Sequence, residues 1–130
     1  MAERRQERIL VVDDDEAVAR ILRLRLESVG YHVHTEGGGA TALLYAAEHP
    51  VDLVILDLRL PDINGYEVCR RLRQLFHSWS LPILMLTGLD QPVDQLRGFA
   101  HGADAYLTKP CEPSELLKTV ALLLGEHALP

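Results

Sequence analysis

The sequence predicts an α/β fold in which a parallel sheet has helices on both of its faces. Short apolar runs typical of strands alternate with amphipathic stretches typical of helices, and this alternation occurs five times. Two of the apolar runs, residues 9–12 and 53–56, are unbroken, which indicates central parallel strands buried on both faces. Both runs lead directly into aspartates. Because ligands bind at the carboxyl ends of strands in open α/β sheets, this edge is the expected location of a functional site.

The composition is that of an ordinary cytoplasmic domain. The 130 residues are 48% hydrophobic and 25% charged, which supplies enough apolar material for a core. The net charge of −6 disfavours direct binding of nucleic acid by this chain. Two cysteines without a CxxC pair favour a reducing compartment, and no apolar stretch near the N-terminus is long enough for a signal peptide or a membrane span. We therefore expect a cytoplasmic protein with no membrane contact.

The first half of the chain is expected to hold three strands and two helices. In order, these are a strand at residues 9–12, a helix that stops at Gly30, a strand at residues 31–36, a helix at residues 40–48 and a strand at residues 53–56. Asp14 or Asp15 can cap the first helix, because a carboxylate accepts hydrogen bonds from free N–H groups at a helix start. The second helix is expected to turn three apolar residues inward: Leu43, Leu44 and Ala47.

The second half repeats the pattern with two strands and three helices. In order, these are a helix at about residues 66–76, a strand at residues 81–86, a helix at residues 92–100, a strand at residues 105–107 and a helix that starts near Pro113 and ends at Gly125. The helix at residues 92–100 is the weakest, with only Val93, Leu96 and either Phe99 or Ala100 to bury. Trp79, in the preceding loop, is expected to be a packing residue.

Four of the expected strands end in residues that suit phosphoryl chemistry. Asp13 and Asp14 follow the first strand, Asp57 the third, Thr87 the fourth and Lys109 the fifth. Mg²⁺ prefers oxygen ligands and usually takes one or two carboxylates together with water and phosphate oxygens. A carboxylate can also act as a nucleophile, and a hydroxyl and an ammonium can neutralise charge on phosphoryl oxygens. The joint placement therefore predicts a phosphoryl-transfer site.

The motifs VVDDDE, VILDLRLPDING, ILMLTG and ADAYLTKP resemble, in this order, those of the receiver domain of two-component response regulators. The resemblance covers about residues 9–124 and implies that residues 1–130 are a single receiver domain, with no output domain visible. It also implies a flavodoxin-like, doubly wound five-stranded parallel sheet in the order 2-1-3-4-5.

The resemblance assigns roles to residues around the expected metal site. Asp57 matches the phosphoacceptor of the family, and Asp13 and Asp14 match its acidic pair. Together with the backbone carbonyl of Arg59, these three carboxylates are implied to hold Mg²⁺, for which Mn²⁺ can substitute.

Four further positions match residues that respond to the phosphoryl group in the family. Thr87 matches the switch hydroxyl and Tyr106 the switch aromatic residue. Lys109 matches the lysine that pairs with the phosphate, and the peptide bond between Lys109 and Pro110 is implied to be cis.

Some positions depart from the family pattern. Cys111 stands where phenylalanine is usual after the Lys-Pro pair, and residues 62–65 replace the common Gly-Met-Asp-Gly loop. Ala105 and Ser114 stand where receivers that dimerise through their last helices usually carry Asp and Arg. The last two departures argue against that type of dimer.

The expected function is a phosphorylation-dependent switch rather than an enzyme that turns over an external substrate. A histidine kinase or a histidine phosphotransfer protein would donate the phosphoryl group, and the surface of the fourth helix, fifth strand and fifth helix would respond. An aspartyl-phosphate phosphatase needs a second acid two positions after the nucleophile, where this chain has Arg59. A flavin-binding module is disfavoured because residues 13–15 would repel the phosphate of the flavin. A receiver that works without phosphorylation is disfavoured because every side chain that phosphorylation requires is present.

Each feature taken alone has a simpler interpretation. The aspartates at residues 13–15 could be only a helix cap, Lys109 a solvated charge and Tyr106 a packing residue. Residues 37–39 are three glycines, but no Gly-Lys-Ser or Gly-Lys-Thr follows, so a plain loop is expected. His32 and His34 share one strand face without an evident third metal ligand.

Overall fold

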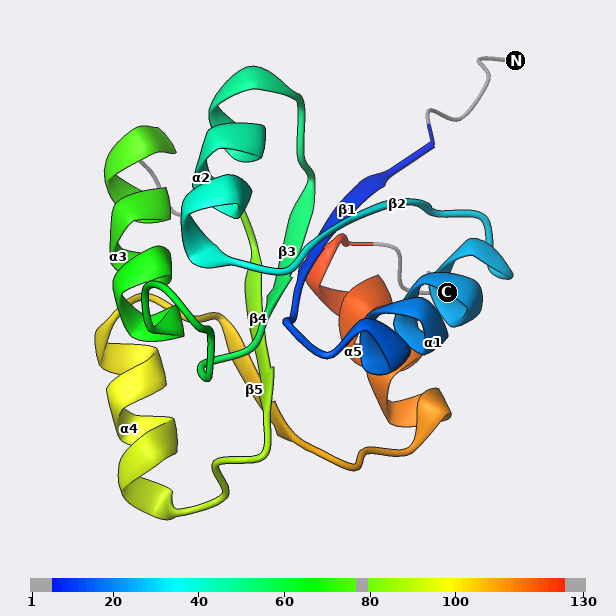
Figure 1. Cartoon of the computed structure of the whole chain (residues 1–130). Coiled ribbons are helices and arrows are strands. Elements are labelled where there is room, and N and C mark those ends of the chain that lie inside the picture. Colours follow the sequence, from blue (N-terminus) through cyan, green and yellow to red (C-terminus); the bar gives the residue numbers. More distant parts are fainter. Residues whose placement is uncertain (1–5, 77–79, 126–130) are drawn as a thin grey trace.

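Five parallel strands form one sheet in the order β2-β1-β3-β4-β5 in the computed structural model, which describes residues 6–76 and 80–125 (Figure 1). The strands are β1 (Arg8–Val12), β2 (His32–Glu36), β3 (Leu53–Leu56), β4 (Ile83–Thr87) and β5 (Ala105–Thr108). The expected fold class and strand order are confirmed. Trp79 lies outside the described residues.

Helices cover both faces of the sheet (Figure 1). On one face lie α2 (Gly39–Glu48), α3 (Gly65–Phe76) and α4 (Pro92–Ala100), and on the other lie α1 (Glu16–Glu27) and α5 (Pro113–Leu123). None of the described helices is long and apolar enough to cross a membrane.

The three central strands supply the middle of both cores. Alternate residues point to opposite faces of a strand, so each strand packs against helices on both sides. On one face the strand residues pack with α2 and α3, and they include Leu10, Val12, Val54, Leu56, Ile83 and Met85. On the other they pack with α1 and α5, and they include Ile9, Val11, Leu53, Ile55, Leu84 and Leu86. Each such side chain contributes about 1.5–3 kcal/mol when fully buried, so these strands hold the sheet edge in place.

Two strands begin later than the sequence patterns predicted, and both shifts have backbone causes. Tyr31 is not part of β2, because its N–H donates to the Leu26 carbonyl in the chain reversal after α1. Gly30 permits that reversal with a positive φ of 100°. β4 begins at Ile83 rather than at residue 81, because Pro82 has no N–H for the sheet ladder.

The prediction of inward-facing residues was wrong for parts of α2 and α4. Leu44 and Ala47 are exposed, because α2 turns Gly39, Ala42 and Ala46 toward the sheet instead. On α4, Val93, Leu96 and Phe99 are 55%, 69% and 46% exposed. Ala100 is also exposed.

Gly98 is the only described residue of α4 that is buried. A Cβ atom at this position would lie 2.8 Å from Met85 Sδ and 3.0 Å from the Tyr106 ring. The absence of a side chain therefore lets α4 lie close to β4 and β5, although the helix buries no large apolar side chain.

The start of α2 is capped by a residue from a distant loop. Gly38, the N-cap residue, has no side chain to offer, and Asp62 takes its place. Its carboxylate accepts hydrogen bonds from Gly39 N at 2.8 Å and from Ala40 N at 2.9 Å. A Cβ at Gly38 would lie 3.3 Å from this carboxylate, so the glycines leave room for it. Gly37 and Gly38 therefore form a loop, as expected, whereas Gly39 is already the first residue of α2, and the carboxylate of Asp62 lies against this segment.

These backbone hydrogen bonds lower the pKa of Asp62 to about 2 from an ordinary value of 3.8. A depressed pKa in the folded state means that the ionised carboxylate stabilises the protein above the unfolded pKa. We therefore expect this contribution to be complete above pH of about 4 and to be lost as the pH falls toward about 2. The urea midpoint of an Asp62→Asn variant should be lower than that of the parent at neutral pH, and the difference should shrink on acidification.

An Asp90→Asn variant is a matched control, since Asp90 lies on an exposed loop before α4. A constant difference between the parent and Asp62→Asn from pH of about 7 down to pH of about 2.5 would contradict the capping role.

Candidate functional site

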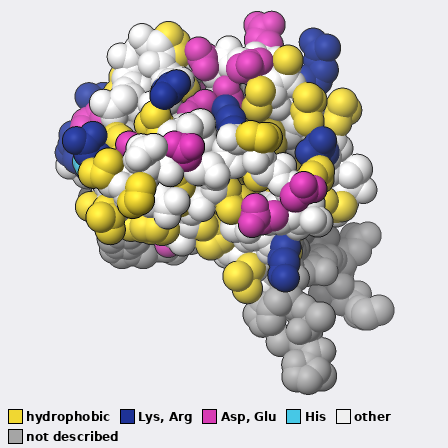
Figure 2. Space-filling view, turned by 90° about the horizontal axis from the view of Figure 1, so that it is seen from below, with side chains coloured by type: hydrophobic (Ala, Val, Ile, Leu, Met, Phe, Trp, Pro, Cys, Tyr) yellow, Lys and Arg dark blue, Asp and Glu magenta, His cyan; other side chains and the backbone are white. Residues whose placement is uncertain are grey.

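The predicted site residues come from the ends of four separate strands, and these ends meet at the carboxyl edge of the sheet. Asp13 and Asp14 follow β1, Asp57 follows β3, Thr87 ends β4 and Lys109 follows β5. β1 pairs with β3, β3 with β4 and β4 with β5, so these strand ends are neighbours in the sheet. Viewed from this side (Figure 2), acidic side chains and Lys or Arg side chains lie among hydrophobic ones.

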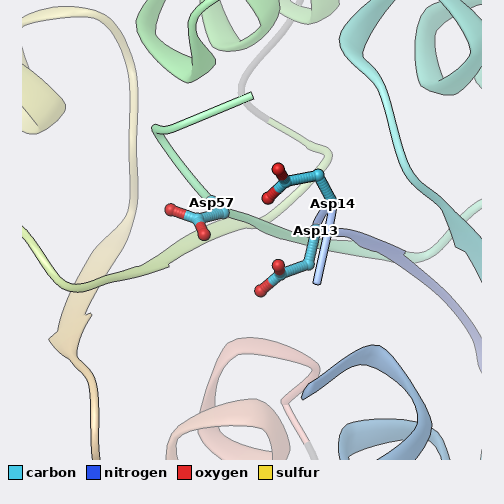
Figure 3. Close-up of side chains that lie close together, drawn as sticks. All are labelled: Asp13, Asp14 and Asp57. Carbon is cyan, nitrogen blue, oxygen red and sulfur yellow. The ribbon is translucent and has the colours of Figure 1, made fainter. Parts of the chain in front are cut away.

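Three carboxylates lie close enough together to share one cation. An oxygen atom from each of Asp13, Asp14 and Asp57 lies within 4.8 Å of the others. Figure 3 shows the three side chains projecting from the ends of β1 and β3 into one space. Asp13 is 4% exposed and Asp57 is 7% exposed, whereas Asp14 is exposed. This set of hard oxygen donors, with one member open to solvent, fits Mg²⁺, which keeps several water ligands.

Backbone N–H groups orient two of these carboxylates. Asp15 N donates to Asp13 Oδ1 at 2.9 Å, and Arg59 N donates to Asp57 Oδ1 at 3.2 Å. The backbone of Asp57 is fixed by its own N–H, which donates to the Val12 carbonyl at 2.9 Å. Both side chains are therefore held by strand ends rather than by mobile loop tips. The Arg59 side chain is exposed.

Lys109 joins the two buried carboxylates. Its Nζ lies 2.6 Å from Asp13 Oδ2 and 2.8 Å from Asp57 Oδ2. Burial lowers the pKa of Lys109, but the hydrogen bonds and charges of Asp13 and Asp57 outweigh burial, so its pKa is raised. Burial raises the pKa of Asp13, and the hydrogen bond from Lys109 offsets this only in part. One ammonium faces three carboxylates, so the site retains an excess of negative charge that favours a divalent cation.

The position of Lys109 is set by the backbone around it. Its N–H donates to the Thr87 carbonyl at 2.8 Å, which continues the pairing of β4 with β5 by one residue. The peptide bond between Lys109 and Pro110 is cis, as the resemblance implied.

Thr87 and Tyr106 are linked through Leu89, a residue that the sequence analysis missed. Thr87 is fully buried, and its Oγ1 accepts a hydrogen bond from Leu89 N at 3.4 Å. The Tyr106 hydroxyl donates to the Leu89 carbonyl at 2.7 Å. Burial, with the negative charges nearby, raises the pKa of Tyr106 to about 12. Because both contacts of Leu89 use its backbone, no side-chain pattern could have revealed them.

An apolar groove opens beside Lys109, between α1 and the start of α5. Its volume is about 390 Å³, and it is lined by Val18, Ile21, Leu22, Arg25, Leu86, Lys109, Pro110, Cys111 and Leu116. Because Lys109 belongs to both the groove and the carboxylate cluster, a molecule that approaches Asp57 from this side would contact the groove.

Comparison with known proteins agrees with this geometry. The family model for the response regulator receiver domain matches residues 9–121. The DNA-binding dual master transcriptional regulator RpaA of Synechocystis sp. is 43% identical over 117 residues, which are 90% of this chain and 48% of RpaA. The alkaline phosphatase synthesis transcriptional regulatory protein PhoP of Bacillus subtilis is 44% identical over 117 residues, with the same shares. The chain thus spans about half the length of these two relatives.

A solved structure of a response regulator described as putative, from Chloroflexus aurantiacus, is 40% identical, with a TM-score of 0.88. The match covers 93% of this chain and 99% of that one. The CheY-like receiver domain protein of Methanospirillum hungatei also has a TM-score of 0.88, at 30% identity, over 94% of this chain and 96% of that one. From the family match, these similarities and the strand order, the chain belongs to the response regulator receiver domain family.

Proposed function

We propose that Asp57 is the phosphoacceptor of this receiver and that its phosphorylation switches the protein between two surface states. The observation that carries the proposal is the contact of Lys109 Nζ with both Asp57 and Asp13 inside the three-carboxylate cluster. A buried nucleophilic carboxylate, a cation site and a fixed ammonium at one strand edge are the components that phosphoryl transfer requires.

In the proposed reaction, an Asp57 carboxylate oxygen attacks the phosphorus of a phosphohistidine on a histidine kinase or a phosphotransfer protein. An oxygen–phosphorus bond forms, the phosphorus–nitrogen bond breaks, and the electron pair stays on the imidazole nitrogen of the donor. Lys109 then pairs with phosphoryl oxygens, as the Thr87 hydroxyl does once it turns toward them. Mg²⁺ or Mn²⁺, when bound, would neutralise charge on the phosphoryl oxygens. Its protein ligands would be Asp13, Asp14, Asp57 and the carbonyl of Arg59.

The proposed site favours a switch over a turnover phosphatase. Hydrolysis of an aspartyl phosphate at a useful rate needs a general acid or base close to the nucleophile. Two positions after Asp57, where such an enzyme carries its second acidic residue, the chain has Arg59. The phosphorylated form would therefore persist long enough to be read by a partner.

The proposed response travels through Leu89 to α4. A phosphoryl group on Asp57 adds about two negative charges and three acceptor oxygens. If the Thr87 side chain turns to donate its hydroxyl to one of them, its Oγ1 moves away from Leu89 N, from which it now accepts a hydrogen bond. The hydrogen bond of Tyr106 to the same residue then changes as well. The responding surface consists of α4, β5 and α5, and its exposed Val93, Leu96 and Phe99 suit an apolar partner surface.

The partners follow from the same geometry. We propose that the phosphodonor contacts the groove beside Lys109 and that a downstream target or an output domain binds the α4 surface.

We also propose that residues 1–130 form one receiver domain that acts in the cytoplasm. The excess of acidic residues, 19 against 13 Lys and Arg, disfavours direct binding of nucleic acid by this domain.

The chemical test is labelling with acetyl phosphate followed by mass spectrometry. We expect a phosphoryl adduct on the parent protein with Mg²⁺ or Mn²⁺ present and none after chelation, because the three carboxylates repel the anionic donor when no cation is bound. An Asp57→Asn variant should not be labelled, whereas Asp90→Asn should be labelled like the parent. Labelling of Asp57→Asn to the extent of the parent would refute the assignment.

A second test concerns the response. A Thr87→Ala variant should still bind beryllofluoride, which mimics the phosphoryl group, because Asp57 and Lys109 are unchanged. The response of α4 should be lost in this variant, because no hydroxyl remains that could move from Leu89 N to the phosphoryl mimic. The measurement is the set of amide shifts of residues 90–102 on adding beryllofluoride, expected to be large in the parent and small in the variant.

Thr41→Ala is the matched control, since its hydroxyl donates to the Gly38 carbonyl after β2, the outer strand opposite β5 in the sheet, and its loss should leave the α4 response intact. If the largest shifts of the parent outside the pocket fall on α2 instead, the responding surface is assigned wrongly.

A further inference from the structure

Hydrogen bonds hold α4 to the body of the protein. Its large apolar side chains Val93, Leu96 and Phe99 are all substantially exposed. Just beyond its C-terminal end, Cys69 Sγ donates to the His101 carbonyl at 3.2 Å, and Arg73 Nε donates to the Gly102 carbonyl at 3.0 Å. A helix held in this way moves readily when a single polar contact is lost.

The N-terminal half of α4 is held by a tyrosine of α3. Tyr66 donates its hydroxyl to the Asp94 carbonyl at 3.1 Å, and its ring lies 5.1 Å from the ring of His101. The side chain is half-buried, and burial raises its pKa. In a regular helix the carbonyl of Asp94 also accepts the N–H of Gly98, the residue at which α4 touches the sheet. The phenol therefore acts on the part of α4 that lies closest to Tyr106.

Tyr66 also lies one residue from a contact with the backbone of Asp57. The preceding residue, Gly65, donates its N–H to the Leu58 carbonyl at 2.9 Å. A Cβ at Gly65 would collide with the Asp57 carbonyl oxygen and would lie 2.6 Å from Leu58 Cα. The first turn of α3 therefore rests directly on the backbone of residues 57 and 58, so any displacement of these residues on phosphorylation would also displace Tyr66.

We propose that Tyr66 is a positioning residue that couples Asp57 to α4 through α3, in parallel with the connection through Thr87, Leu89 and Tyr106. This inference rests on the proposed function. In the present arrangement two phenols hold neighbouring parts of one segment, Tyr106 at Leu89 before α4 and Tyr66 at Asp94 within it. Among the described residues, the Tyr66 side chain contacts the Asp94 carbonyl and the His101 ring, so we infer that it acts through the position of α4.

The test uses a Tyr66→Phe variant of the full chain, which keeps the ring and removes only the hydroxyl. Without phosphorylation, amide hydrogen exchange of residues 92–100 should be about three- to tenfold faster than in the parent, the effect of losing one net hydrogen bond. Exchange in β1 and β3 should not change. Tyr45→Phe is the matched control, because Tyr45 lies on α2, where its ring stacks on His34 and His49.

The second readout is beryllofluoride affinity, which a purely structural role would leave unchanged or weaken. In the proposal the Tyr66 hydrogen bond holds α4 in its unphosphorylated position, so its removal should tighten binding about two- to fivefold, because coupling between two sites is reciprocal. Unchanged exchange in α4, or faster exchange without tighter binding, would overturn the inference. Failure of the proposed function would show differently, as a parent protein that binds no beryllofluoride.

Discussion

The contact of Lys109 with Asp13 and Asp57 is the interaction on which the arrangement of the site depends. It joins the ends of β1, β3 and β5, which are far apart in the sequence, through one ammonium. Removing one partner of a buried ion pair typically costs about 3–5 kcal/mol, because the other charge is left buried without compensation. Here the compensation is incomplete, since the third carboxylate, Asp14, adds negative charge at the mouth of the site. The cluster is therefore stable enough to fold and still favours a cation.

The same site is connected to a part of the fold that is held more weakly. The central strands are fixed by fully buried apolar side chains, whereas α4 contributes only Gly98 to the interior among the described residues. Tyr106 donates to the carbonyl of Leu89 just before α4, and Tyr66 donates to the carbonyl of Asp94 within it. Under the proposed function, the added charge of about two at Asp57 would act between a rigid sheet on one side and a weakly held helix on the other.

Local patterns predicted the sheet and the gathering of the site residues because both follow from strand ends. Unbroken apolar runs identified β1 and β3, and the residues after them could only lie at one edge of a parallel sheet. The exposure of the apolar side chains of α4 was not predicted, because the spacing of apolar residues does not show whether they pack against the rest of the same chain or face solvent. Asp62, Leu89 and Tyr66 were missed for a related reason. Asp62 and Tyr66 contact backbone atoms of distant segments, and Leu89 takes part only through its own backbone, so none of these contacts leaves a signal in the sequence.

The most direct test of the central claim is the effect of Mg²⁺ on thermal unfolding at constant ionic strength. A cation that binds only the folded carboxylate cluster should raise the unfolding midpoint with added MgCl₂, and a hundredfold excess over the dissociation constant corresponds to about 2.7 kcal/mol. An Asp14→Asn variant should need more Mg²⁺ for the same rise, whereas Asp90→Asn should behave like the parent. A midpoint that does not change with MgCl₂ in the parent protein would contradict the account.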